Sequence, residues 1–176
     1  MQERRPLAAL TLTEPTPPVE PVEPIERSGS ARKRYLTLGG VALVVVALDQ
    51  LTKTWAEHAL ADHDIHLFWT LRLSLTYNPG IAFGVGRGAT PVLVVVAVIV
   101  FVVLLAFSRS VQNPVRVVAM GLVLGGAMGN LVDRFFRSNG GAVIDFVDLQ
   151  WWPVFNVADA CLFCGAILLI LTASKQ

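Results

Sequence analysis

The amino-acid sequence predicts an all-α membrane protein with four transmembrane helices and a small β element on their outer side. Hydrophobic residues make up 54% of the 176 residues and charged residues only 15%, a composition more apolar than that of ordinary soluble domains. The apolar residues gather in four runs, each near the roughly 20 residues needed to cross a bilayer. Turn and strand patterns occupy two of the segments between the runs.

Residues 1–34 form a separate, polar part of the chain. They contain six of the ten prolines, with Glu, Thr and Ser between them. Such a composition cannot bury enough apolar surface to fold, so we expect a disordered, Pro-rich tail. We do not expect a cleaved secretory signal, because residues 1–30 hold no apolar core of adequate length. A single membrane domain, residues 35–176, follows.

The four apolar runs are interpreted as membrane-spanning helices. A helix satisfies its own backbone hydrogen bonds in lipid, whereas an open strand cannot, so even the Val-rich second run is expected to be helical. Its first residue, Pro91, is tolerated because the N–H that proline lacks would have no partner in a first turn. The predicted spans are residues 36 to about 56, 91–107, about 115 to 132, and 155–173.

Basic residues next to the spans predict the orientation. Four spans place both ends of the chain on one side, and the run ARKR at residues 31–34 lies directly before the first span. The other basic residues next to the spans on that side are Arg109, Arg116 and Lys175. Because Lys and Arg gather in cytoplasmic loops, we expect both termini in the cytoplasm, which makes residues 1–34 a cytoplasmic tail.

The two outer loops carry the patterns of a small β element. Residues 67–88 alternate apolar and polar side chains around the turn sequence NPG, and residues 142–149 have strand-like character after the turn sequence SNGG. Trp151 and Trp152 fit the aromatic belt of a membrane surface. We therefore expect the β element to rest on the outer leaflet, where it could hold a substrate.

Polar residues lie toward the outer ends of three of the predicted spans. They are Asp49 and Lys53 in the first span, Asn130 and Asp133 in the third, and Asn156 and Asp159 in the fourth. A charged side chain at membrane depth is costly unless it is paired or hydrated, so their meeting at one level indicates a site. Asp49 and Lys53 have the spacing of a neutralising helix pair, which is interpreted as structural.

Glycines in the third span predict close helix packing. Gly121, Gly125 and Gly129 recur at intervals of four and form a ridge of small residues that lets a second helix approach. The neighbouring ridge consists of Gly126, Asn130 and Arg134. No Lys follows the glycines as it does in a phosphate-binding loop, so a nucleotide site is not expected.

Acidic side chains are the remaining source of catalytic chemistry. The three histidines share one loop, and Cys161 and Cys164, interpreted as packing residues, have no partner pair at metal spacing, so we expect no metal and no cofactor. Two carboxylates held close share a proton, and one then acts on water while the other protonates a carbonyl. Spacing alone leaves four candidates for such a pair, Asp133, Asp145, Asp148 and Asp159.

Two other classes of function stay open on these residues. Intramembrane acids also mark ion pathways, so one is a small proton-coupled transporter or channel subunit, whose acids would line a path across the membrane. The other is an assembly protein whose polar residues only join helices. The net charge of +1 and the scattered basic residues argue against a nucleic-acid partner.

Five motifs in chain order resemble those of the lipoprotein signal peptidases, the signal peptidase II family. They are DQLTK at 49–53, YNPGIAFG at 77–84, GGAMGNLVDR at 125–134, VIDF at 143–146 and FNVADA at 155–160. The resemblance, over roughly residues 40–172, implies an aspartic endopeptidase of the bacterial inner membrane. Such an enzyme removes the signal peptide of a prolipoprotein just before a cysteine that carries diacylglycerol. The family fold implies four helices that carry a small extracytoplasmic β-cradle.

The resemblance also implies roles for individual residues. It places the catalytic pair on Asp145 and Asp159, near the outer face of the membrane. The residues implied in substrate binding are Asn78, Gly80, Asn130, Arg134 and Asn156. Those implied in structural support are Asp49, Lys53, Gly126 and Ala158. The expected partners are lipid-modified prolipoproteins and membrane phospholipids, and we expect a monomer.

Overall fold

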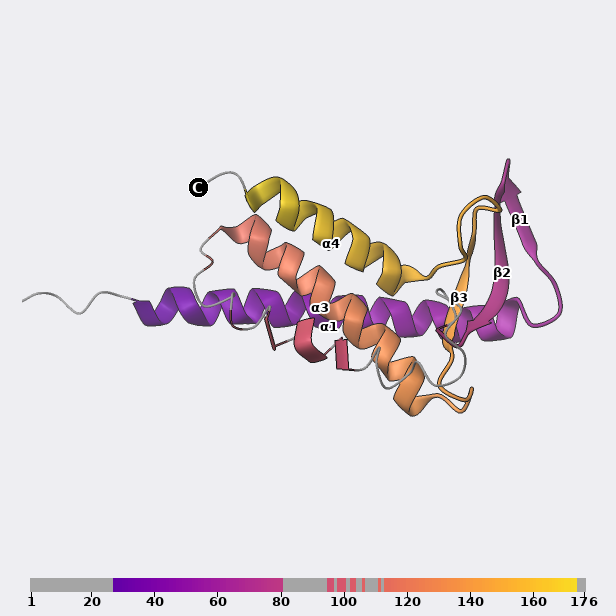
Figure 1. Cartoon of the computed structure of the whole chain (residues 1–176), viewed down its shortest axis with the longest axis horizontal. Helices are drawn as coiled ribbons and strands as arrows, with labels where there is room; N and C mark the ends of the chain where they lie inside the picture. The colour runs from indigo at the N-terminus through magenta and orange to yellow at the C-terminus, as the bar shows by residue number, and fades with distance from the viewer. Residues whose placement is uncertain are drawn as a thin grey trace, which may run out of the picture.

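The computed structural model of the chain combines long helices with a small sheet. It describes residues 27–80, 95–96, 98–100, 102–103, 106, 111 and 113–173. Its elements are, in order, α1 (Arg27–Ala59), β1 (Ile65–Phe68), β2 (Leu71–Asn78), α3 (Pro114–Phe136), β3 (Val143–Asp148) and α4 (Val157–Ala173). The sheet lies at the end of the helices where α1 terminates (Figure 1).

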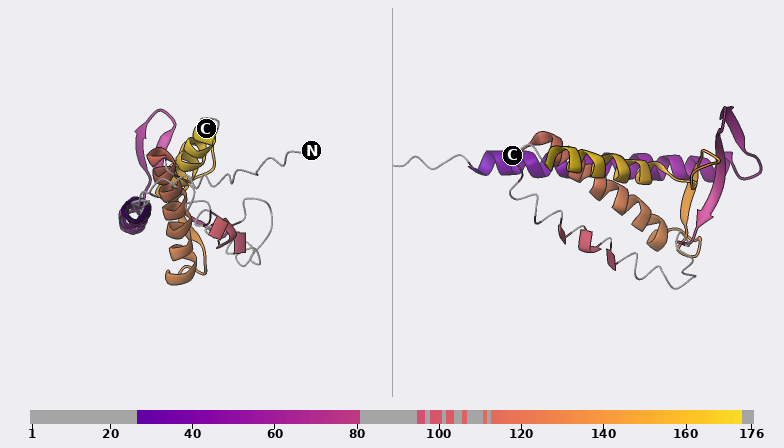
Figure 2. Two further views of the ribbon diagram at one scale, coloured as in Figure 1. Left: turned by 90° about the vertical axis from the view of Figure 1, so that its left-hand side faces the viewer. Right: turned by 45° about the horizontal axis from the view of Figure 1, so that its top comes forward.

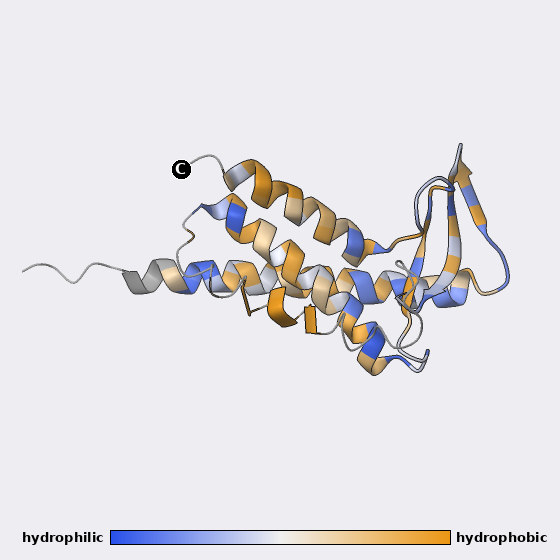
Figure 3. Ribbon diagram, in the orientation of Figure 1, coloured by the Kyte–Doolittle hydropathy of each residue, from blue (hydrophilic) through white to orange (hydrophobic). Residues whose placement is uncertain are grey.

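Two of these helices are long and apolar enough to cross a membrane, residues Ala31–Ala59 of α1 and Pro114–Phe136 of α3. α4 is apolar but shorter, with 17 residues, so its crossing of the membrane stays a prediction. The predicted span at residues 91–107 lies mostly outside the described residues. The middle parts of the helices are mainly apolar, hydrophilic residues gather near the helix ends, and the sheet contains both kinds (Figure 3). The predicted combination of apolar helices with a small β element is confirmed.

α1 extends beyond the predicted span at both ends. It begins at Arg27, before the expected boundary at residue 35, and residues 1–26 lie outside the described part of the chain. The residues ahead of the span include Ala, Arg and Lys, which favour helix, and lengthening an existing helix costs far less than starting one. The tail and the first helix therefore overlap in sequence.

α3 is the centre of the helical packing. It packs against both α1 and α4 (Figure 2). Its start follows the local sequence, because the Asn113 side chain accepts a hydrogen bond from the Val115 N–H at 2.9 Å and Pro114 fills the first helical position. One apolar core cluster between α1 and α3 consists of Leu38, Ala42, Val117, Met120 and Leu124.

The glycines of α3 serve two different neighbours. A Cβ atom on Gly125 would lie 2.6 Å from Cβ of Val45 on α1, and one on Gly121 would lie 2.8 Å from Cβ of Val41. A Cβ atom on Gly126 would instead overlap the backbone carbonyl of Ala158 on α4. The two predicted ridges are therefore confirmed as the contacts that let α1 and α4 approach α3 closely.

The sheet is antiparallel, with the order β1-β2-β3. The NPG turn does not separate β1 from β2, as the alternating pattern suggested. The hairpin turns at Trp69, which has a positive φ of 49°, and NPG instead ends β2, because Pro79 has no N–H to continue the ladder. The predicted strand near residues 142–149 is confirmed as β3, and Gly140 and Gly141 take positive φ values of 68° and 81° in the preceding turn.

Candidate active site

The polar residues of three helices meet the sheet at one end of the molecule. The buried members of this group are Asp49, Lys53, Asp133, Asp145 and Asn156. Buried polar groups are stable in a fold only when they are hydrogen-bonded or paired. The contacts within the group therefore decide which side chains hold the structure together and which are available to a substrate.

Lys53 joins α1 to α3 and uses all of its donors. Its Nζ lies 2.8 Å from Oδ2 of Asp49 and 2.8 Å from Oδ2 of Asp133, and it donates to Oδ1 of Asn130 at 3.0 Å. An ammonium group has three N–H donors and no acceptor, so these contacts satisfy it. The predicted pairing of Asp49 with Lys53 is confirmed.

Asp133 is also committed to contacts within the protein. Its Oδ1 accepts a hydrogen bond from Nε2 of Gln50 at 2.8 Å, and its Oδ2 accepts one from the Ile144 N–H at 3.0 Å. Nε of Arg137 lies 3.3 Å from Oδ1. Asp133 therefore ties α3 to α1 and to β3.

Asp148 is the last residue of β3, at the opposite end of this strand from Ile144, which contacts Asp133. Its Oδ2 is 2.7 Å from Nε of Arg72, its register partner on β2. A hydrogen bond from the Gln150 N–H, together with Arg72, holds the pKa of Asp148 below its usual value. Of the four acids that spacing left open, Asp133 is thus paired with Lys53 and Asp148 with Arg72. The remaining two, Asp145 and Asp159, lie close together.

Asp159 is held at the start of α4 by reciprocal hydrogen bonds with Asn156. The Asp159 N–H donates to Oδ1 of Asn156 at 2.9 Å, and the Asn156 N–H donates to Oδ2 of Asp159 at 3.2 Å. This is a capping box, and a carboxylate in a first helical turn is favoured by the helix dipole. Oδ1 of Asp159 accepts from Nδ2 of Asn130 at 2.8 Å.

Asp145 faces this helix start from β3. Its Oδ1 accepts from Nδ2 of Asn156 at 2.7 Å and its Oδ2 from Nδ2 of Asn78 at 3.0 Å. One asparagine, Asn156, therefore contacts both acids. Burial raises the pKa of Asp145 to about 6, and the nearby negative charge of Asp159 adds to the rise.

The turn at the end of β2 sets the orientation of Asn78. The Gly80 N–H donates to Oδ1 of Asn78 at 2.9 Å, and Gly80 has a φ of 86°. Glycine adopts this conformation without strain. Because Oδ1 of Asn78 is engaged by the turn, its Nδ2 is left to donate to Asp145.

Lys53 sets the orientation of Asn130 in the same way. Lys53 can only donate, so the carbonyl oxygen of the Asn130 amide must face it. The Asn130 amide nitrogen then points to Asp159. Lys53 thus acts on Asp159 through Asn130, and it contacts neither Asp145 nor Asp159.

Three further predicted residues surround the pair. The Ala158 N–H donates to Oδ1 of Asp49 at 3.0 Å, which fixes the start of α4 on α1. Gly126 allows α4 to approach α3 at this level. Arg134 donates from Nη1 to the Asn130 carbonyl at 3.1 Å, while its buried Nε has no hydrogen-bond partner among the described residues.

Sequence reasoning missed two residues of the cluster. Gln50 donates to Asp133, and Arg137 donates to Oε1 of Gln50 at 3.1 Å and pairs with Glu57. Glu57 on α1 therefore pairs with a residue just beyond the end of α3. The four-residue spacing of Asp133 and Arg137 was the available signal for Arg137.

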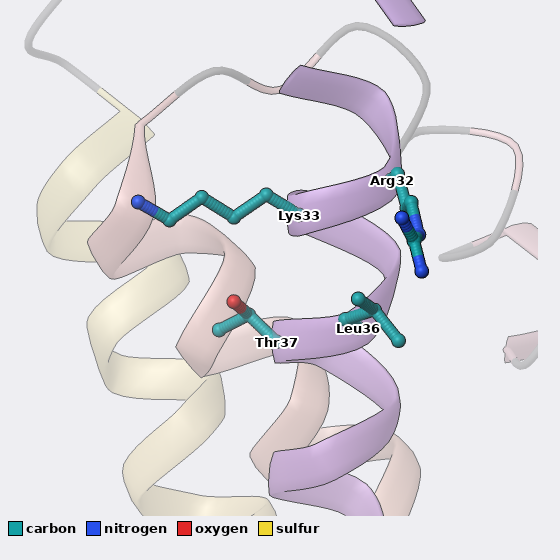
Figure 4. A pocket seen from close by; sticks show the side chains of 4 residues that line it. All are labelled: Arg32, Lys33, Leu36 and Thr37. Atoms are coloured by element: carbon teal, nitrogen blue, oxygen red, sulfur yellow. The ribbon is translucent and has the colours of Figure 1, made fainter. Parts of the chain in front are cut away.

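The opposite end of α1 carries a different kind of surface. A hollow there is lined by Arg32, Lys33, Leu36 and Thr37 (Figure 4). It contains no acid and lies far along α1 from Asp49, so it is no candidate for acid–base chemistry.

Within the described ranges, no group of three or more His, Cys, Asp or Glu side chains could hold a metal ion. Cys161 and Cys164 are free, and Cys164 is exposed, so it does not pack in a core.

The fold and the site define a helical membrane protein whose acids lie at one end of the helices, beneath a small sheet. The sequence matches the family described as signal peptidase (SPase) II over residues 41–175, and the chain belongs to this family.

Individual relatives agree with this assignment. The chain is 45% identical over 155 residues to the lipoprotein signal peptidase of Rhodococcus jostii strain RHA1, a match that covers 82% of this chain and 78% of the relative. It is 41% identical over 135 residues to that of Syntrophomonas wolfei, covering 75% and 89%. A solved structure described as a bacterial membrane enzyme superposes with a TM-score of 0.66 at 26% identity, covering 85% of this chain and 96% of the other.

Proposed function

We propose that the protein is an aspartic endopeptidase that cleaves the signal peptides of prolipoproteins, with Asp145 and Asp159 as its catalytic pair. The observation that carries this proposal is the contact of both acids with Asn156. Asn156 holds the two carboxylates near one another, and two neighbouring carboxylates that share one proton are the arrangement that activates water for peptide hydrolysis. Membership of the signal peptidase II family supports the same reaction.

Burial assigns the two roles, because Asp145 is buried and Asp159 only partly so, and burial raises the pKa of Asp145 to about 6. Asp145 holds the shared proton, and Asp159 takes a proton from the water that attacks the carbonyl carbon of the scissile bond. Asp145 then protonates the carbonyl oxygen. As the tetrahedral intermediate collapses, Asp159 protonates the leaving amine and Asp145 regains its proton from the hydroxyl. The reaction uses no metal or other cofactor.

Substrate contacts are assigned to the polar residues around the pair. The Nε–H of Arg134, which has no partner among the described residues, is assigned to donate a hydrogen bond to a carbonyl or lipid oxygen of the substrate. Asn78, Gly80, Asn130 and Asn156 position the acids, and the first three, which are half-buried, also present polar surface to the substrate. The substrate is a prolipoprotein whose cysteine already carries diacylglycerol, because a site at membrane depth gives a lipid anchor direct access from the bilayer.

The basic end of α1 supports the proposed placement in the membrane. Arg32 and Lys33 are exposed at this end, opposite the acids (Figure 4). Positive charge marks the cytoplasmic side, so residues 1–34 and the C-terminus lie in the cytoplasm and the acids near the outer face of the bacterial inner membrane. Residues 35–176 form the four-helix peptidase domain, and the protein acts as a monomer in contact with phospholipids.

The two competing functions predict other arrangements. A proton pathway needs ionisable groups along the length of the helices, whereas the acids described here gather at the sheet end. A purely structural role accounts well for Lys53, Asp49 and Asp133, whose atoms are used within the protein. It does not account for Arg134, whose buried Nε has no partner among the described residues.

A cleavage assay with purified variants tests the proposal. Asp145→Asn and Asp159→Asn are expected to fold and to lose cleavage of a diacylglyceryl prolipoprotein. Asp148→Asn, an acid on the same strand that contacts Arg72, is the matched control and should retain cleavage. Unlipidated substrate should be a poor substrate for the unchanged protein. Retained cleavage by either Asp145→Asn or Asp159→Asn would refute the assignment.

A further inference from the structure

A groove of about 480 Å³ lies between α1 and α3, away from the acids. Its lining contains no polar side chain and includes Gly39, Leu43 and Val46 of α1 and Leu124 and Met128 of α3. A Cβ atom on Gly39 would meet nothing within 4 Å, so the groove is open at this glycine. The proposed peptidase reaction uses none of these residues.

The described neighbours of α3 leave this groove uncovered. α4 packs against the face of α3 that carries Gly126, whereas Leu124 and Met128 lie two residues before and after it and so belong to the opposite face. The described pieces of the predicted second span, residues 95–96, 98–100 and 102–103, lie on the side of α3 away from α1 (Figure 2). The groove therefore faces the bilayer.

One stripe of α1 connects the groove with the basic end of the helix. Its residues alternate in spacing between four and three, which places them on one helical face, and they are Arg32, Leu36, Gly39, Leu43 and Val46. The first two also line the hollow at the basic end, where they point to one side of α1 (Figure 4). Lys33 and Thr37 point to the other side. The stripe thus has one cation at its end and apolar residues along the rest.

The charge and the length of this stripe match a single anionic phospholipid. Arg32 is exposed, and no Asp or Glu occurs in residues 27–48 of α1, 114–132 of α3 or 160–173 of α4. A guanidinium group binds a phosphate through two parallel hydrogen bonds. Between Leu36 and Val46, α1 rises about 15 Å, which is half of the roughly 30 Å hydrocarbon core and equals the depth of one leaflet.

We propose that this stripe binds one anionic phospholipid of the leaflet at the basic end, with the lipid phosphate at Arg32 and an acyl chain in the groove against Gly39. Tyr35, one helical turn before Gly39 and 42% exposed, places a hydroxyl group at the level of the headgroup. A bound lipid stabilises the contact between α1 and α3, because a ligand that binds only the folded chain stabilises it. The inference does not depend on the peptidase activity.

Native mass spectrometry of the full chain in detergent tests the headgroup contact. Dioleoyl phosphatidylglycerol should bind with at least about fivefold higher affinity than dioleoyl phosphatidylcholine, whose choline carries a compensating positive charge. Arg32→Gln should reduce this preference to about twofold or less. Lys33→Gln removes the same charge one residue away, on the other side of the helix, and should retain the preference. Equal affinities of the two lipids for the unchanged protein, or equal losses in the two variants, would overturn the proposal.

Two neighbouring glycines test the acyl-chain contact. Gly39→Leu fills the groove, so the affinity for dioleoyl phosphatidylglycerol should fall at least about fivefold, less than the loss of two buried methylene groups would produce. Gly40→Leu is the matched control, because a Cβ atom at Gly40 also meets nothing within 4 Å and Gly40 does not line the groove. In the unchanged protein, dihexanoyl phosphatidylglycerol keeps the headgroup but not the long chains, and it should bind more weakly by at least the same factor. Equal binding of the long and short lipids would refute the acyl-chain contact.

A protein in the groove would give a different result. If residues 91–107 or a second copy of the chain filled it, Gly39→Leu would lower the unfolding temperature in lipid-free detergent, or change the mass of the assembly, and Gly40→Leu would not. Either outcome would overturn the proposal in favour of a protein contact. The lipid site instead predicts equal unfolding temperatures and a monomer mass for both variants without lipid.

Discussion

Asp145 and Asp159 obtain their different surroundings from the same three asparagines. Asn156 contacts both acids, Asn78 contacts only Asp145, and Asn130 contacts only Asp159. Each of these asparagine amides is oriented by a neighbour, as the Gly80 N–H orients Asn78 and Lys53 orients Asn130. Single side-chain changes at the edge of the site should therefore alter the titration of the pair.

Removing Asn78 is expected to shift the pH dependence of cleavage. Its hydrogen bond favours the ionised form of Asp145, so Asn78→Ala should raise the pKa of Asp145 further above about 6. The active pair holds one proton, and activity falls as pH rises and that proton is lost. The alkaline limb of the pH profile of kcat/KM should thus move to higher pH.

The control for this experiment is Asn139→Ala, because the Asn139 side chain makes no hydrogen bond to the described residues. Its alkaline limb should coincide with that of the unchanged protein. An alkaline limb that stays in place or moves to lower pH in Asn78→Ala would show that Asn78 does not stabilise the ionised acid.

Replacing Lys53 should cost most of the stability of the fold. Lys53→Met leaves Asp49 and Asp133 buried without their shared cation, and breaking a buried pair from one side costs about 3–5 kcal/mol. Lys33→Met, at the exposed basic end of the same helix, should change stability by no more than about 0.5 kcal/mol. Thermal unfolding in detergent measures both, and equal unfolding temperatures would contradict the assigned role of Lys53.

Local spacing predicted only part of this cluster. Asp49 and Lys53 could be paired from sequence because one helical turn separates them. The contacts of Gln50 with Asp133 and of Arg137 with Glu57 join α1 to residues around the end of α3. Such contacts follow from how the helices pack, which spacing along one helix does not specify.

At the scale of whole elements, the small residues of α3 decide how near the acids lie to one another. Gly126 lets α4 approach, and α4 carries Asp159, whereas Asn130 on α3 must reach it across the same interface. The strands could be predicted from alternation, but the hairpin turn could not. Trp69 turns the chain without a Gly, Pro or Asn at that position to signal it.

Gly126→Ala should separate α3 from α4. The added Cβ overlaps the Ala158 carbonyl, which belongs to rigid backbone, and overpacking of this kind costs about 1–3 kcal/mol. Cleavage should fall together with the unfolding temperature, because Asn130 is drawn away from Asp159. Gly40→Ala, on α1, has nothing within 4 Å of the new atom and should leave both unchanged. A fully active Gly126→Ala protein would argue against close packing at this level.

Over the whole molecule, hydropathy, basic residues and turn patterns predicted apolar helices, an orientation and a β element on the outer side, whereas the direction of the β1–β2 hairpin emerged only from the fold. Composition can show that a segment enters lipid, but the direction of a hairpin depends on the strand partner it finds. β3 supplies that partner for β2, and it does so from a segment far along the chain.

The orientation can be measured with single cysteines. In a background of Cys161→Ala and Cys164→Ala, Ser138→Cys at the acid end should react with a membrane-impermeant maleimide added to intact cells or sealed right-side-out vesicles. Lys33→Cys should react only after the membrane is permeabilised, because basic residues lie on the cytoplasmic side. The reverse pattern of labelling would invert the proposed topology.

The full use of Asn130 has a consequence for inhibitor resistance. Its Oδ1 accepts from Lys53 and Asn156, and its Nδ2 donates to Asp159. Any substitution there that weakens a bound compound also removes a hydrogen bond from Lys53 and another from Asp159, and each hydrogen bond to a charged group contributes about 1.5–3 kcal/mol. Compounds that contact Asn130 and Asn156 should therefore select few resistant variants within the cluster, and those that arise should map to exposed positions such as Tyr77.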